Sequence, residues 1–98
     1  MTISKQKNGN TLTMAVAGRL DTITSPELEA ALKDEFEGLG TLIFDFSALD
    51  YISSAGLRVL LAAQKQMNKQ GEMKVTGVSE VIMEIFEVTG FTDILTIE

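Results

Sequence analysis

The first part of the chain has the residue pattern of two β-strands. In residues 11–18, larger apolar side chains alternate with small or polar ones, which is the period of a strand with one buried face. Residues 3–7 form a second, less apolar stretch, and the intervening Asn8-Gly9-Asn10 is typical of a tight turn. These two stretches are therefore predicted to pair as an antiparallel hairpin.

Three later stretches repeat apolar residues at helical spacing. The first begins at Thr24-Ser25-Pro26, where a hydroxyl cap and an early proline favour a helix start, and it is predicted to end at Gly38 and Gly40. The second and third run over residues 54–69 and 79–88. Their predicted buried residues are Leu28, Leu32, Phe36 and Leu39, then Leu57, Leu60, Leu61 and Ala63 or Gln64, then Val81, Ile82, Ile85 and Phe86.

Short apolar stretches between these helices predict further strands. Residues 41–46 are almost continuously apolar, which is typical of a central strand covered on both faces. Residues 73–76 predict another strand, and residues 94–97 a last short one. The order strand, strand, helix, strand, helix, strand, helix and final strand predicts an α/β fold, in which helices pack on a mixed β-sheet. With no linker or repeat, residues 1–98 are expected to form a single domain.

Charge and length narrow the range of partners and locations. The net charge is -6, so nucleic acid and anionic membrane surfaces are not expected to bind directly. A basic or mixed protein surface fits this charge better. No apolar run approaches the roughly 20 residues that cross a bilayer, and Met1 leads into Thr2-Ile3-Ser4-Lys5-Gln6 rather than into the basic and then apolar segments of a signal peptide. The sequence therefore predicts a cytoplasmic protein.

The residue types that most enzymes depend on are missing. The chain has no cysteine and no histidine, so thiolate nucleophiles and the commonest general base and metal ligand are absent. A small hydrolase that uses Ser53 or Ser54 as nucleophile would have no activating group nearby in the sequence. We therefore expect a non-enzymatic protein whose function lies on its surface.

The most informative segment joins the strand at 41–46 to the second helix and contains Ser53 and Ser54. In open α/β sheets, partners tend to meet the loops at the carboxyl ends of the strands. One interpretation is that either serine caps the helix, which stabilises it by roughly 1 kcal/mol. The other is that the small residue at 55 and Gly56 after the serines leave open and flexible access to a hydroxyl that a kinase phosphorylates. A phosphate there would face the positive end of a helix dipole, so the fold would tolerate it.

A second candidate segment is Gly18-Arg19-Leu20-Asp21, which follows the second predicted strand. If that strand neighbours the strand at 41–46, Asp21 lies on the same edge as Ser54 and could orient its hydroxyl or contact a kinase. The competing interpretation is a local turn or cap bond.

Together these segments resemble the STAS domain of sulfate transporters and anti-sigma factor antagonists. The similarity rests on Asp45-Phe46-Ser47, on Ile52-Ser53-Ser54-Ala55-Gly56-Leu57 running into an apolar helix, and on Gly18-Arg19-Leu20-Asp21 upstream. It covers essentially the whole chain, in order and spacing. The resemblance implies that Asp45 braces its loop.

The resemblance also implies partner switching. An unphosphorylated antagonist binds an anti-sigma factor that is a serine kinase and so frees the sigma factor; phosphorylation breaks the complex, and a phosphatase resets it. Ser54 matches the phosphorylated serine. The expected partner-binding residues are Asp21, Thr22, Ser53, Ala55, Gly56 and Arg58. ATP and magnesium would come with the kinase, and no cofactor is expected on this chain.

One residue departs from the family pattern. An acidic residue commonly precedes the phosphorylated serine, and here that position is Ser53, which makes Ser53 an alternative acceptor. A different function also fits the same fold, namely a structural STAS subunit of a lipid-transport complex or a scaffold of a signalling assembly.

Overall fold

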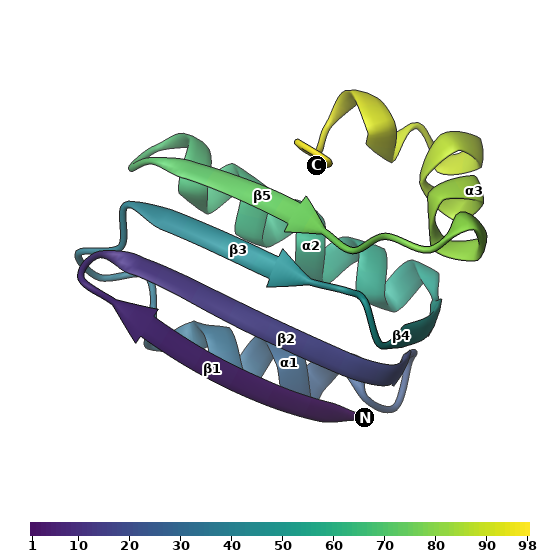
Figure 1. Ribbon diagram of the computed structural model, residues 1–98, viewed down its shortest axis with the longest axis horizontal. Helices are drawn as coiled ribbons and strands as arrows, with labels where there is room; N and C mark the ends of the chain where they lie inside the picture. The colour runs from purple at the N-terminus through teal and green to yellow at the C-terminus, as the bar shows by residue number, and fades with distance from the viewer.

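The computed structural model describes residues 1–98 and confirms the α/β class (Figure 1). Its elements, in chain order, are β1 Thr2–Asn8, β2 Thr11–Leu20, α1 Ser25–Lys33, β3 Thr41–Asp45, β4 Leu49–Ile52, α2 Ser54–Asn68, β5 Glu72–Thr76, α3 Glu80–Thr89 and the 3-10 helix η1 Phe91–Asp93. No helix is both long enough and apolar enough to cross a membrane.

The sheet is mixed, as predicted. Its strand order is β1-β2-β3-β5, and β4 pairs separately with β2. The predicted hairpin of β1 and β2 is antiparallel, and β3 lies between β2 and β5, parallel to both. The carboxyl ends of these three parallel strands therefore meet at one end of the molecule, where β4 and α3 also lie (Figure 1).

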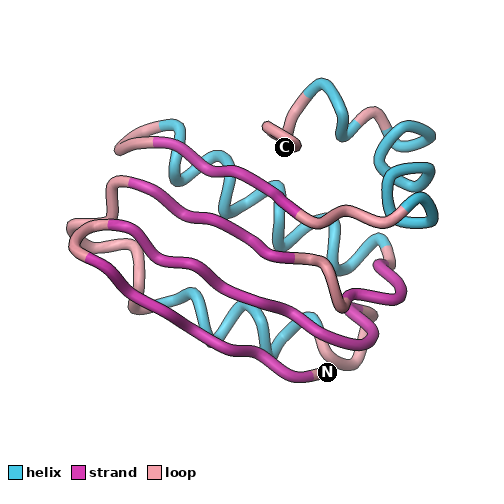
Figure 2. Tube along the Cα trace, viewed as in Figure 1, coloured by secondary structure: helices cyan, strands magenta, loops and turns pink.

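Helices α1 and α2 cover one face of the sheet, and the other face has no helix on it (Figure 2). The prediction that the strand at 41–46 is covered on both faces is therefore wrong. Leu42 and Phe44 are fully buried under the helices, whereas Ile43 is only half-buried on the open face. Ile43 pairs with Thr13 of β2 and Lys74 of β5, whose side chains give partial cover. A continuous apolar run thus misled the prediction, because one of its residues faces outward.

The first helix is shorter than predicted and ends at Lys33 rather than at Gly38. Phe36 and Leu39 still pack on the core, but from the loop that follows the helix. The carbonyls of these two residues accept hydrogen bonds from Nε2 of Gln70, at 2.5 and 2.7 Å. The amide side chain after α2 therefore holds this loop in place of further helical turns.

The C-terminal part of the chain also differs from the prediction. The last strand is reduced to one parallel bridge between Val75 and Ile97. In α3, Ile82 and Phe86 are buried as predicted, but Val81 is 58% exposed. The reason is that α3 packs through one narrow face against β4, at the end of the sheet, and leaves its other flanks to solvent.

Candidate functional site at the start of helix α2

A change of strand partner within β2 builds the site. Residues Thr11 to Ala15 pair with β3, whereas Gly18 to Leu20 pair with β4, and the register shifts after Gly18. Gly18 has a φ of +92°, a conformation that favours glycine, and its N–H donates to the carbonyl of Ala48 at 2.9 Å. This bulge turns the end of β2 toward β4 and so toward the start of α2.

Asp21 closes a tight turn directly after β2. Its Oδ1 accepts hydrogen bonds from the backbone N–H groups of Ile23 and Thr24, both at 3.0 Å. The hydroxyl of Thr24 makes no cap bond to α1, contrary to the prediction, but donates to the carbonyl of Arg19 at 2.7 Å. Asp21 thus makes the local turn bonds of the competing interpretation, and its carboxylate is occupied by them rather than by Ser54.

The hydrogen bonds of this turn lower the pKa of the Asp21 carboxyl group. The backbone hydrogen bond from Thr24 contributes most to lowering its pKa, with further contributions from the Thr24 hydroxyl, the Ile23 N–H and Arg19, while partial desolvation acts in the opposite direction. Nε of Arg19 lies 3.7 Å from Oδ2 of Asp21. Asp21 therefore presents a fixed negative charge beside the site at neutral pH.

Ser53 and Ser54 have different roles at the junction of β4 and α2. Ser53 is the N-cap residue: its half-buried Oγ accepts a hydrogen bond from the N–H of Gly56 at 3.5 Å. The N–H of Ser53 donates to the carbonyl of Leu20 at 2.9 Å, which ties the junction to the residue before Asp21. Ser54 is the first residue of α2 and is exposed. Capping therefore does not occupy the Ser54 hydroxyl.

Gly56 allows the close packing beneath these serines. It is buried, and a Cβ at this position would lie 2.8 Å from both Cγ of Leu20 and Cγ1 of Ile52. The expectation that Gly56 provides flexible access to the serine is therefore wrong: the glycine lets α2 approach β2 and β4. Any contribution of Gly56 to partner binding is indirect, through the shape of the surface.

The remaining predicted site residues surround Ser54. Thr22 and Arg58 are exposed and Ala55 is half-buried. Arg58 lies one turn after Ser54, where residues four apart share a helix face. The guanidinium of Arg19 stacks on the ring of Tyr51, 4.4 Å from its centroid. The structure thus brings Asp21, Thr22, Ser53, Ser54 and Arg58 to one end of the molecule.

Two residues of this surface were missed by the sequence analysis. Ile23, in the turn after Asp21, is 84% exposed and is the most exposed large apolar side chain of the chain. Tyr51 belongs to β4, a strand that was taken for a connection. Leu49 and Ile52 are buried while Asp50 and Tyr51 between them are more exposed, a spacing of three rather than the two-residue alternation of a strand, so no periodic signal marked β4.

The loop that leads into β4 is braced by Asp45 at the end of β3. Its Oδ1 accepts hydrogen bonds from the hydroxyl and from the N–H of Ser47, the latter at 3.0 Å. The hydroxyl bond is the larger of the two effects that lower the pKa of Asp45. Asp45 therefore shapes the loop, as the resemblance implied.

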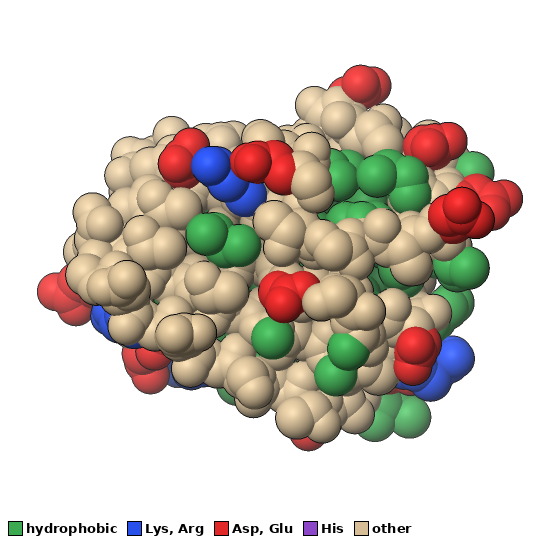
Figure 3. Space-filling view, in the orientation of Figure 1, with side chains coloured by type: hydrophobic (Ala, Val, Ile, Leu, Met, Phe, Trp, Pro, Cys, Tyr) green, Lys and Arg blue, Asp and Glu red, His purple; other side chains and the backbone are tan.

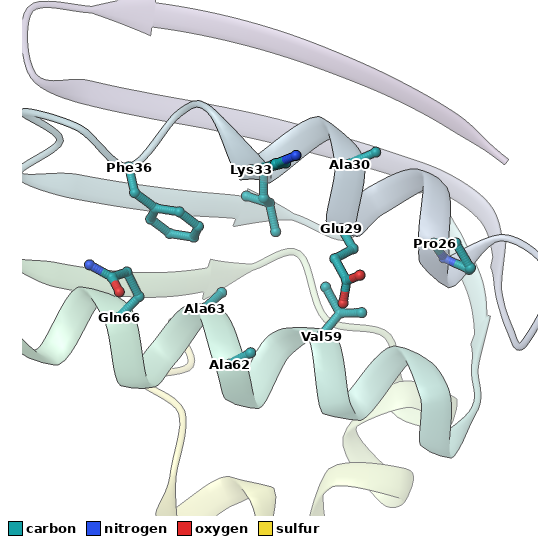
Figure 4. Close-up of a pocket in the computed structure, with 10 residues that line it drawn as sticks. Pro26, Glu29, Ala30, Lys33, Phe36, Val59, Ala62, Ala63 and Gln66 are labelled. Carbon is teal, nitrogen blue, oxygen red and sulfur yellow. The ribbon is translucent and has the colours of Figure 1, made fainter.

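A groove of about 460 Å³ lies apart from these residues, between α1 and α2 (Figure 4). Pro26, Glu29 and Lys33 line it from α1, and Val59 and Gln66 from α2. None of the predicted site residues borders this groove. No group of three or more acidic, histidine or cysteine side chains is placed to hold a metal ion.

The comparisons with known proteins agree with this architecture. The family model of the STAS domain matches residues 2–98. The anti-sigma-B factor antagonist of Listeria monocytogenes is 32% identical over 97 residues, which are 96% of this chain and 84% of that protein.

Solved structures show the same fold. An anti-sigma factor antagonist from Mycobacterium paratuberculosis superposes with a TM-score of 0.88 at 23% identity, covering 98% of this chain and 83% of that chain. The Bacillus cell fate determinant SpoIIAA in its phosphorylated form gives a TM-score of 0.78 at 16% identity, covering 99% and 91%. By its sequence and its fold, the chain belongs to the STAS domain family, together with the anti-sigma factor antagonists.

Proposed function

We propose that this protein is an anti-sigma factor antagonist controlled by phosphorylation of Ser54. Unphosphorylated, it binds a serine-kinase anti-sigma factor and frees a sigma factor. The kinase then phosphorylates Ser54, which breaks the complex, and a phosphatase restores the active form. In this proposal the chain acts by binding and catalyses no reaction itself.

The observation that carries the proposal is the division of roles between the two serines. Ser53 caps α2 with its half-buried hydroxyl, whereas Ser54 is exposed on the first turn. This arrangement favours Ser54 over Ser53 as the acceptor, because a kinase must reach the hydroxyl without undoing the helix cap. The Listeria relative is named an anti-sigma-B factor antagonist, and SpoIIAA has been solved in a phosphorylated form.

Charge explains how a phosphate at Ser54 would act. The start of a helix attracts anions, and Arg58 is close enough in sequence to share the helix face. A phosphate would therefore be tolerated by the fold. Its two negative charges would join the fixed charge of Asp21 on the same surface, and the change would be felt by the partner rather than by the domain.

The test is to incubate the protein with ATP, magnesium and purified kinase-type anti-sigma factors from its own genome, and to locate phosphate by mass spectrometry. We expect one phosphate on Ser54, retained in Ser53→Ala and lost in Ser54→Ala. Modification of Ser53 instead would contradict the assignment of roles.

The same experiment distinguishes the antagonist function from the alternative, a structural subunit. A structural subunit of a transport complex or signalling scaffold would copurify with its assembly whether or not ATP is present. Stable association with such subunits, combined with no phosphate on either serine, would favour that function over the antagonist.

A further inference from the structure

Helix α3 carries an apolar stripe that the rest of the chain covers only in part. Val81 is 58% exposed and Val88 is 82% exposed, and half-buried Ile85 lies between them. The three residues are four and three positions apart, so they lie along one face of the helix. Together with Glu84 and Thr89 they line a shallow hollow of about 270 Å³. We call Val81, Ile85 and Val88 the α3 stripe.

The α3 stripe lies beside the face that holds α3 on the domain. Ile82 and Phe86 are fully buried and provide that attachment. Val81 and Val88 lie beside that face and are mostly exposed, whereas Ile85, between them, also packs partly against the core. Apolar residues at helical spacing that stay largely exposed, as Val81 and Val88 do, are typical of a binding site for another protein.

The border of the α3 stripe is acidic. Glu84 lines the hollow of the stripe and also a neighbouring hollow, which Glu80 and Glu87 line as well. All eight Lys and Arg residues precede position 75, so none lies on α3 or in the tail after it. Figure 3 shows red and green side chains next to each other at the end of the molecule where α3 lies.

The position of α3 connects the stripe to the site around Ser54. Helix α3 packs against β4, the strand that leads directly into Ser53 and Ser54. In Figure 1 both lie at the same end of the molecule. A partner that covers Ser54 can therefore extend over β4 to α3 without crossing the rest of the domain.

We propose that the α3 stripe is a second docking surface for the kinase-type anti-sigma factor, and this inference rests on the proposed function. The matching segment of the partner carries apolar side chains flanked by Lys or Arg, which face Glu80, Glu84 and Glu87. A second copy of this chain is a poorer occupant, because pairing two α3 stripes would bring their acidic borders together. The α3 stripe then contributes affinity, while Ser54 controls whether the complex forms.

The test measures the affinity of the unphosphorylated protein for a purified kinase-type anti-sigma factor by isothermal titration calorimetry. The double variant Val81→Ser/Val88→Ser is expected to bind about tenfold more weakly. Its matched control is Ala30→Ser/Ala62→Ser, which makes one exposed side chain of α1 and one of α2 polar. This control should bind like the unmodified protein. Thermal unfolding of all variants checks that the fold is unchanged.

Charge is tested separately on the same surface. Glu84→Lys should weaken binding about fivefold at low salt and flatten the dependence of affinity on salt. Glu37→Lys, at an exposed position in the loop after α1, should change neither. For Val81→Ser/Val88→Ser, the KM for phosphorylation of Ser54 should rise while kcat stays the same, since the acceptor is untouched.

The outcomes separate this inference from the proposed function. If the Val81→Ser/Val88→Ser protein binds normally while Ser54→Asp binds weakly, the α3 proposal is wrong and the antagonist function stands. If the unmodified protein binds no kinase-type anti-sigma factor, the antagonist function fails and the α3 proposal with it. If sedimentation shows a dimer at neutral pH that the Val81→Ser/Val88→Ser change dissociates, the stripe pairs with itself, which also overturns the proposal.

Discussion

Ser54→Asp is expected to lower the affinity for the kinase-type anti-sigma factor by about 100-fold or more. Ser54 is exposed on the first turn of α2, at the centre of the candidate site. An aspartate there places a negative charge where the partner must approach and adds it to the charge of Asp21. The loss should appear in a direct binding measurement at low salt, where the repulsion is not screened.

The fold provides the control for this prediction. A carboxylate on the first turn of a helix is stabilising, and Arg58 four residues later can pair with it, so Ser54→Asp should unfold no more easily than the unmodified protein. Ser54→Ala, which adds no charge, should bind within about twofold of normal. Equal affinities of the Asp and Ala variants would mean that charge at position 54 does not control the partner.

Gly56→Val is expected to destabilise the protein by about 3 kcal/mol. Even a Cβ at this position would lie 2.8 Å from Cγ of Leu20 and from Cγ1 of Ile52, and both residues are buried and cannot move aside freely. Valine adds two further methyl groups. Helix α2 would have to shift away from β2 and β4, and the Ser53–Ser54 junction would shift with it.

Urea unfolding at neutral pH measures this effect. Ala62→Val is the matched control, since it introduces the same side chain at an exposed position of the same helix and should cost less than about 1 kcal/mol. If Gly56→Val were as stable as the control, the close packing of α2 against β2 would not be important for the fold.

Periodicity in the sequence was sufficient to predict most elements of the fold. The alternation in β2 and the helical repeats of α1, α2 and α3 each reflect one buried face, and this is the property that periodicity measures. Periodicity failed to predict burial where a residue's burial depends on how two elements pack together. Whether Ile43 is covered depends on which face of the sheet the helices occupy. The exposure of Val81 depends on which side of α3 packs against β4.

The candidate site was predicted only in its residues, not in its geometry. Strand β4 has four residues and pairs with β2 only because the bulge at Gly18 redirects that strand. The sequence marks Gly18 but not the change of partner. In the same way, the spacing of small residues identifies the segment at 53–56, but only the packing against Leu20 and Ile52 distinguishes a glycine needed for contact from one needed for flexibility.

The sequence likewise did not show which of Ser53 and Ser54 caps α2; the structure does. Either serine could have been the cap on spacing alone. The hydrogen bond from the Gly56 N–H to Ser53 Oγ, and the bond from the Ser53 N–H to Leu20, assign that role to Ser53. Asp21 is held in its own turn, so its effect on a partner comes from its charge and position.

The most direct test of the switch is a competition measurement with the protein and its Ser54-phosphorylated form. A labelled sigma factor is bound to the kinase-type anti-sigma factor, and its release is followed as either form is added. The unphosphorylated protein is expected to release the sigma factor at near-stoichiometric concentration, and the phosphorylated protein is expected not to release it. Equal release by both forms would contradict control through Ser54, and no release by either would contradict the antagonist function.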